Sequence, residues 1–139
     1  MAEISTVMVR SLMAENPATL DRNETLDIPD TIMNLGRIRH MPVVEDGKVV
    51  GILSQRDLFR SALIVALGFG RRTTSALIKT IRVKEVMTKP AITITADAAV
   101  SDAARLMIEK KIGCLPVVEN ERLIGLITET DILRSVVER

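Results

Sequence analysis

Two segments of this chain carry the same polar pattern, in which a glycine is followed by a hydroxyl residue and then by an aspartate. The first is Gly51–Asp57 and the second is Gly125–Asp131. Each is predicted to pass from a strand into a helix that starts at Ser54 or Thr128. A hydroxyl residue with an acid three positions later is typical of a helix-capping box, which is the stronger interpretation of either copy alone. A helix N-terminus can also attract phosphate, while an aspartate one turn later accepts hydrogen bonds from ribose hydroxyls.

The pattern occurs twice because nearly the whole chain repeats with an offset of 74 residues. Pro42–Glu45 recurs as Pro116–Glu119, and Met33 falls on Met107. We predict three regions, which are repeat 1 at 1–63, a connector at 64–82 and repeat 2 at 83–139. A single repeat of this size buries only about 60% of its surface. We therefore expect the two repeats to pack face to face as a pseudo-twofold pair with one shared core.

Each repeat is predicted to have the order β-α-β-β-α, which places the chain in the α/β (α+β) class. In repeat 2 we expect a first strand at 91–94, a helix that Asp97 caps and Gly113 ends, strands at 115–118 and 123–127 with a turn at Asn120, and a helix at 128–137. In repeat 1, Asp46-Gly47 predicts a type I′ hairpin turn, and Pro29 fits near a helix start. Residues 63–67 are predicted to extend the last helix of repeat 1, and 68–70 to break it.

The composition excludes several classes of protein. The 139 residues include no Trp or Tyr, one Cys and one His, with a net charge of +1. Stacking platforms for nucleic acid, a disulfide framework and a Cys/His zinc site are therefore not expected, and neither is a broad basic field for DNA. No apolar run is long enough to span a membrane, and no secretory signal is evident, so we expect a cytoplasmic protein.

Catalysis is not expected either. His40 and Cys114 occupy matched positions before the paired prolines, which suggests a common structural slot rather than a nucleophile and its base. No third orienting group, P-loop or nucleophile elbow accompanies them. A basic run from Arg71 to Lys84 is interpreted as a solvated connector, with a site for a partner or a polyphosphate as the alternative. A DNA-binding protein would need a recognition helix rich in Arg, Lys, Asn or Gln, which is absent.

The full order of motifs resembles the CBS (cystathionine β-synthase) domain. In each repeat, a valine and a methionine four residues later precede a strand, a helix, a Pro-Val-Val-Glu strand, a turn and the Gly-x-x-[Ser/Thr]-x-x-Asp pattern. The resemblance covers 9–63 and 83–137. A tandem pair of such domains is a Bateman module.

This resemblance implies a regulatory module that senses adenosine-containing ligands such as AMP, ADP, ATP or S-adenosylmethionine, with no obligatory cofactor. It implies two clefts between the repeats, a homodimer and an unidentified effector protein. Carried over residue by residue, cleft one would use Ser54, Asp57, Ile92, Gly113 and Cys114, and cleft two would use Thr128, Asp131, Ala18, Arg39 and His40.

The two clefts are expected to differ. Arg39 and His40 would give cleft two a positive charge that Gly113 and Cys114 do not provide to cleft one. Cleft two should therefore bind a charged nucleotide more tightly, so that loss of Asp131 weakens AMP binding more than loss of Asp57. The alternative function is a dimerisation or interaction scaffold whose clefts stay empty, with apolar helix faces such as Leu63–Leu67 carrying the contacts.

Overall fold

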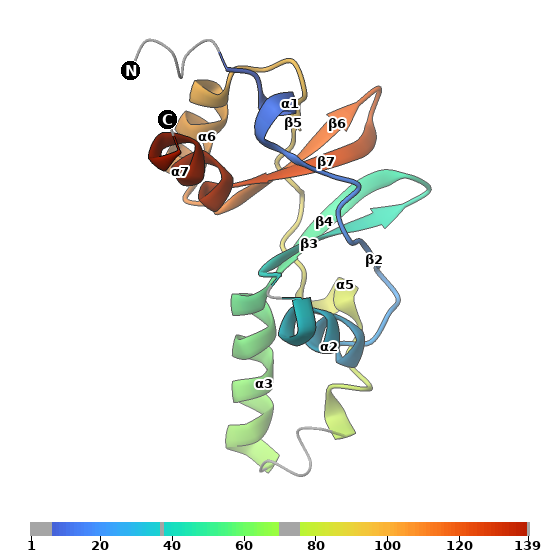
Figure 1. The fold of residues 1–139 in the computed structure, drawn as a ribbon. Helices are drawn as coiled ribbons and strands as arrows, with labels where there is room; N and C mark the ends of the chain where they lie inside the picture. The colour runs from blue at the N-terminus through green and yellow to red at the C-terminus, as the bar shows by residue number, and fades with distance from the viewer. Residues whose placement is uncertain (1–6, 37, 70–75, 139) are drawn as a thin grey trace. The chain divides into compact units, whose positions relative to one another are not determined.

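The computed structural model describes residues 7–36, 38–69 and 76–138, whose fold is drawn in Figure 1. Helices and two sheets alternate along the chain, which confirms the α+β class. The chain forms two compact units. Unit 1 combines Met1–Pro17 with Ala91–Arg139, and unit 2 is Ala18–Pro90. The opening segment of each sequence repeat therefore belongs to the compact unit of the other repeat.

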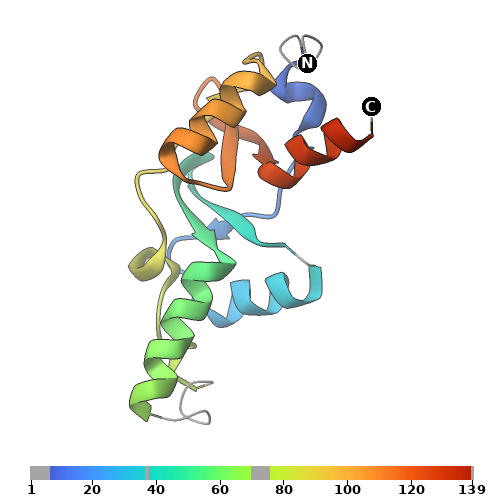
Figure 2. The ribbon, with the colours of Figure 1, turned by 90° about the vertical axis from the view of Figure 1, so that its left-hand side faces the viewer.

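Unit 2 has the predicted β-α-β-β-α order. It contains β2 (Leu20–Asp21), α2 (Asp27–Gly36), β3 (His40–Glu45), β4 (Lys48–Ser54), α3 (Gln55–Phe69) and α5 (Val83–Val86). Its sheet has the order β2-β3-β4, with β2 parallel and β4 antiparallel to β3. Helix α2 packs beside α3 (Figure 2). The β3–β4 hairpin leads directly into α3, because β4 ends at Ser54 and α3 begins at Gln55.

Unit 1 has the same order with an extra strand. It contains α1 (Val9–Leu12), β1 (Ala14–Glu15), β5 (Ile94–Thr95), α6 (Val100–Lys110), β6 (Cys114–Glu119), β7 (Arg122–Thr128) and α7 (Glu129–Val137). The sheet order is β1-β7-β6-β5. Helices α6 and α7 contact each other beside the β6–β7 hairpin (Figure 1). Among the described residues, no helix has both the length and the apolar character needed to cross a membrane.

The hairpin turns follow the sequence prediction. Asp46 and Gly47 both have positive φ angles, of 53° and 79°, as a type I′ turn requires. Asn120 and Glu121 repeat this geometry with φ angles of 52° and 67°. Pro29 is the third residue of α2 and is buried, so its position near the helix start is also confirmed.

Four local predictions are wrong. The strand predicted at 91–94 begins only at Ile94. The N-cap of α6 is Ala99, and Asp97 instead forms an ion pair with Arg10 at 3.3 Å. Helix α6 ends at Lys110, and its C-cap Lys111 takes a left-handed φ of 57°, whereas Gly113 was expected to end the helix. Gly68 lies within α3, and the remaining predicted breaker, Gly70, falls outside the described residues together with Arg71 and Arg72.

The buried side chains of the described residues form two clusters, one within each unit, and a core shared between the repeats stays a prediction. The cluster of unit 1 includes Val9, Val117 and Ile127, and the cluster of unit 2 includes Leu53 and Val83. Val9 and Val83 occupy matched positions at the start of the two repeats. Each valine completes the core of the unit that holds the rest of the other repeat.

The glycine of each repeated pattern lies against the opening segment of the other repeat. A Cβ atom on Gly125 would lie 2.5 Å from Met13 Sδ and 3.0 Å from the Ala14 carbonyl oxygen. On Gly51 it would lie 2.6 Å from Met87 Sδ and 3.0 Å from a backbone oxygen. Both glycines therefore admit a neighbouring chain segment.

Candidate functional site

The end of β4 and the start of α3 form the first candidate site, which we call the β4–α3 junction. His40, the first residue of β3, pairs directly with Ser54, the last residue of β4. The Ser54 N–H donates to Asp57 Oδ2 at 3.0 Å, and the Asp57 N–H donates to Ser54 Oγ at 3.1 Å. This is the predicted capping box. The Gln55 N–H donates to the Arg39 carbonyl at 2.8 Å, so Arg39 is held at the same junction.

The β7–α7 junction, where β7 ends at Thr128 and α7 begins at Glu129, repeats this arrangement in unit 1. Cys114 pairs with Thr128, and the Glu129 N–H donates to the Gly113 carbonyl at 3.0 Å. The Thr128 N–H donates to Asp131 Oδ2 at 2.9 Å. The Asp131 N–H donates to Thr128 Oγ1 at 3.3 Å, which completes the second capping box.

These bonds limit what each helix N-terminus offers to a ligand. At α3, the N–H groups of Ser54, Gln55 and Asp57 already have partners within the chain. The matched groups of α7 are used in the same way. Sequence analysis noted that these helix N-termini can attract phosphate, because an α-helix leaves its first N–H groups without intrahelical partners. A ligand must therefore be held mainly by side chains.

The two aspartates keep part of their hydrogen-bonding capacity. Both are half-buried, and in each capping box only Oδ2 accepts from the backbone. Asp57 Oδ1 has no hydrogen-bond partner among the residues that the structure describes. Asp131 Oδ1 lies 3.9 Å from Arg134, and its side chain remains 19% exposed. Each carboxylate can therefore cap its helix and still accept from a ligand hydroxyl.

The predicted site residues fall into two sets. Unit 2 brings together Arg39, His40, Ser54 and Asp57, with Ala18 exposed just before β2. Unit 1 brings together the remaining five, with the Ile92 side chain packed against the core: Ile92, Gly113, Cys114, Thr128 and Asp131. The sharing of clefts between the repeats stays a prediction.

A hollow of about 280 Å³ opens at the β4–α3 junction. It is lined by Met33 and Asn34 from α2, by Arg39 and by Gln55. Sequence analysis identified Arg39 but missed the other three. Gln55 directly follows Ser54 in the repeated pattern, which was a usable signal. Nothing in the sequence marked Met33 or Asn34 as facing this hollow rather than only the core or solvent.

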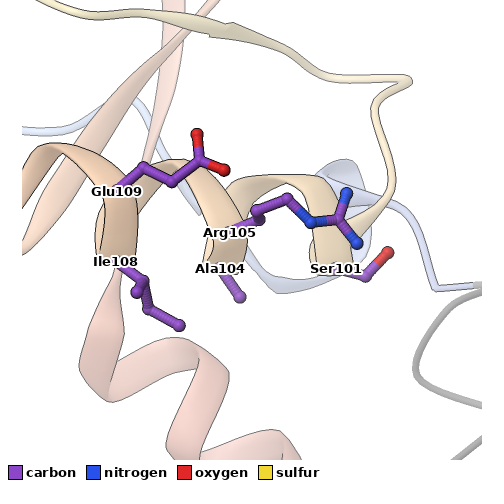
Figure 3. Close-up of a pocket in the computed structure, with 5 residues that line it drawn as sticks. All are labelled: Ser101, Ala104, Arg105, Ile108 and Glu109. Atoms are coloured by element: carbon purple, nitrogen blue, oxygen red, sulfur yellow. The ribbon is translucent and has the colours of Figure 1, made fainter.

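A larger depression of about 510 Å³ runs along α6, as Figure 3 shows. It is lined by Ser101, Ala104, Arg105, Ile108 and Glu109, which all project from this one helix. None of them is a predicted site residue, and no second element contributes to the lining. No group of His, Cys, Asp and Glu residues suited to a metal ion occurs within 7–36, 38–69 and 76–138.

The Cys114 thiol is a core group rather than a nucleophile. Burial, followed by the nearby Glu129 carboxylate, raises the pKa of this thiol from 9.0 to about 12. The thiol is therefore neutral at pH 7, whereas nucleophilic cysteines have lowered pKa values.

This shift predicts a pH dependence of stability. The folded state holds the thiol proton more tightly, so the associated stability is complete below pH 9 and is lost as the pH rises toward 12. Between pH 8 and pH 11, the free energy of unfolding should fall by about 2 kcal/mol more in the wild type than in Cys114→Ala. Urea denaturation at both pH values measures this difference. Equal pH dependence in the two proteins would show that the thiol is not shielded.

Comparison with known proteins places this geometry in a family. A family model for the CBS domain matches residues 9–63 and 83–138. A CBS domain-containing protein of Dictyostelium discoideum is 31% identical over 134 residues, which cover 95% of this chain and 92% of that protein. A homoserine O-acetyltransferase of Methanohalobium evestigatum is 31% identical over 137 residues, which cover 97% of this chain and 25% of the enzyme. The chain thus spans about a quarter of that relative.

Solved structures give the same result. A CBS domain pair in complex with 5′-methylthioadenosine and S-adenosyl-L-methionine has a TM-score of 0.79 and 27% sequence identity. The match covers 96% of this chain and 98% of that one. The fold of that domain pair is similar to the fold of this chain. Each of the two regions that the CBS family model matches contains one of the β-to-helix junctions described above. The chain belongs to the CBS domain family, and both of its repeats are CBS domains.

Proposed function

We propose that this chain is a regulatory module that binds adenosine-containing ligands, among them S-adenosylmethionine and adenine nucleotides such as AMP, ADP and ATP. The supporting observation is the likeness to a CBS domain pair whose structure holds two adenosine compounds. Those two compounds share the adenine and ribose groups. The common recognition task is therefore to hold the base and the ribose hydroxyls.

In this proposal Asp57 and Asp131 hold the ribose. Each carboxylate is fixed by its capping box, so little side-chain freedom is lost when a ligand binds. Hydrogen bonds to a charged acceptor contribute about 1.5 to 3 kcal/mol. No bond is broken or formed in the ligand. Binding would shift the population of conformations, and the output would pass through a homodimer or an effector protein.

A second candidate function is a dimerisation or interaction scaffold that binds no ligand. The observation in its favour is an exposed apolar stripe on α3. Phe59, Leu63 and Leu67 follow one another at intervals of four residues, and they are 65%, 59% and 80% exposed. Residues four apart lie on one helix face, so this stripe is suited to contact with another protein surface.

A thermal-shift panel separates these two functions. Saturation with a bound ligand at about 100 times its Kd stabilises a protein by about 2.7 kcal/mol, which raises Tm by several degrees. We expect such a dose-dependent rise with at least one compound among S-adenosylmethionine, 5′-methylthioadenosine, AMP, ADP and ATP. Guanosine monophosphate should give a smaller shift.

Matched variants locate the binding. Asp57→Asn and Asp131→Asn keep a side-chain oxygen for the capping box but remove the charge that attracts ribose hydroxyls. At least one of them should reduce the shift, whereas Asp102→Asn, on the exposed face of α6, should not. If no adenosine compound raises Tm while the protein self-associates through α3, the scaffold function is supported instead.

A further inference from the structure

Two methionines occupy matched positions in the opening segments of the two repeats. Met13 is the C-cap of α1, and Met87, 74 residues later, is the C-cap of α5. Both have extended backbone angles, and each N–H donates to the carbonyl of a buried valine, Val9 or Val83, at 3.0 and 2.9 Å. The backbone of each methionine is therefore fixed in the same way within its own unit.

Each thioether lies directly against the backbone of a strand. A Cβ atom on Gly125 would be 2.5 Å from Met13 Sδ and 3.0 Å from Met13 Cγ. On Gly51 it would be 2.6 Å from Met87 Sδ and 3.0 Å from Met87 Cγ. The sulfur thus fills the space that a side chain on the strand would take, and the rest of each methionine packs against the core of its unit. An additional atom between sulfur and strand would displace one of them.

The residue that follows each methionine attaches the opening segment to the same strand. Ala14 pairs with Leu126 in the ladder of β1 and β7. Thr88 exchanges two backbone hydrogen bonds with Ile52 of β4, at 2.8 and 3.0 Å. Displacement of the neighbouring sulfur would therefore release the opening segment from the strand.

These two sulfurs are also partly accessible to solvent. The Met13 and Met87 side chains are half-buried, whereas Met8 is 43% exposed. Three further methionines are at most 6% exposed: Met33, Met41 and Met107. The Cys114 thiol is buried as well. A small oxidant can thus reach the two sulfurs that contact a strand while the sulfurs of the cores stay shielded.

We propose that Met13 and Met87 are a matched pair of reversible oxidation sites, through which a peroxide releases the opening segments of the repeats. In this step the thioether sulfur attacks one oxygen of hydrogen peroxide, an S–O bond forms as the O–O bond breaks, and water leaves. The sulfur loses two electrons, which the peroxide accepts. The product is methionine sulfoxide, which methionine sulfoxide reductases convert back to methionine. The inference goes beyond the proposed function and does not depend on it.

Two physical effects make the sulfoxide incompatible with this packing. The added oxygen enlarges a group that already touches a glycine backbone, and it places a polar acceptor at the edge of an apolar core. The strands concerned end at Ser54 and Thr128, three residues after each glycine. Oxidation would therefore loosen the strands that lead into the two junctions.

Hydrogen exchange of the full chain, before and after treatment with hydrogen peroxide, tests this inference. Peptide mass mapping should find sulfoxide first at Met8, then at Met13 and Met87, and only later at the three buried methionines. Amide protection of Ile52 and of β1 and β7 should fall about 10-fold or more once Met13 and Met87 are oxidised. Reductases for both sulfoxide epimers should restore it.

Leucine variants assign the effect to each sulfur, because leucine has a similar volume and cannot be oxidised. Met13→Leu should abolish the peroxide-induced loss of protection in unit 1 and leave the loss in unit 2. Met87→Leu should do the reverse. Met8→Leu, which removes the most exposed of the described sulfurs, is the control and should change neither response. Exchange of the untreated variants shows whether they are folded, and the reductase arm tests the wild type without them.

Three results would overturn the inference. The first is sulfoxide at Met13 and Met87 that forms no earlier than at the buried methionines, since the sulfurs would then be inaccessible. The second is full oxidation of both residues with unchanged protection of the strands. The third is a loss of protection that persists in folded Met13→Leu and Met87→Leu proteins or that the reductases fail to reverse.

Discussion

Replacing Val9 by Asp is expected to destabilise the protein by about 4 kcal/mol or more. Val9 is fully buried in the core of unit 1, although it belongs to the opening segment of repeat 1. Its N–H donates to the Ala98 carbonyl at 2.8 Å, so the segment cannot easily move the new carboxylate into water. Burial of an unpaired charge is among the most costly single changes in a protein.

Hydrogen exchange shows where this destabilisation begins. Protection should be lost first in β6 and β7 of unit 1, because Val9 belongs to the same buried cluster as Val117 and Ile127. The milder Val9→Ala keeps the protein folded and should give the same order of loss. Val83→Asp should act first on unit 2. Val137→Asp, at an 81% exposed position, is the control and should change stability by less than about 0.5 kcal/mol. Loss that begins in β3 and β4 after Val9→Asp would contradict the exchange of opening segments.

The second large effect is expected from Gly125→Val, which should lower the free energy of unfolding by about 3 kcal/mol. The new Cβ would lie 2.5 Å from Met13 Sδ, and the neighbouring backbone oxygen of Ala14 at 3.0 Å is fixed in the pairing of β1 with β7. Overpacking of this kind forces side chains and backbone to shift. Urea denaturation followed by circular dichroism measures the change.

Gly51→Val and Gly68→Ala make this prediction specific. Gly51→Val should have a similar cost, because Met87 and Thr88 lie against Gly51 in the same way. Gly68 has no atom within 4 Å of an added Cβ, and it lies within α3. Gly68→Ala should therefore stabilise the helix by up to about 1 kcal/mol. A Gly125→Val protein as stable as the wild type would show that no segment lies against this glycine.

The local features were predictable because their causes are local. Asp46-Gly47 requires positive φ angles at adjacent residues, and few other dipeptides adopt them readily, so the hairpin turn followed from the sequence. The capping boxes were predictable for the same reason, since Ser54 and Asp57 are three residues apart. The offset of 74 residues then gave the same features in the second repeat.

The exchanged segments were not predictable from these patterns. A glycine at position 51 or 125 shows that something approaches the backbone, but a single sequence does not show that Met87 or Met13 does so. Asp97 has the residue type of an N-cap, yet its partner is Arg10, 87 residues away. Likewise, Asn34 joins the candidate site only because α2 packs beside α3. These contacts depend on the folded arrangement rather than on local spacing.

Calorimetric titration of S-adenosylmethionine and AMP into the wild-type chain and the Asp57→Asn/Asp131→Asn double variant tests the central claim most directly. The account predicts saturable binding of at least one of these compounds to the wild type and an affinity at least about 10-fold lower in the double variant. Circular dichroism should show that the double variant is folded. Absence of saturable binding to the wild type at millimolar ligand, or equal affinity in a folded double variant, would contradict the claim that the paired junctions hold an adenosine ligand.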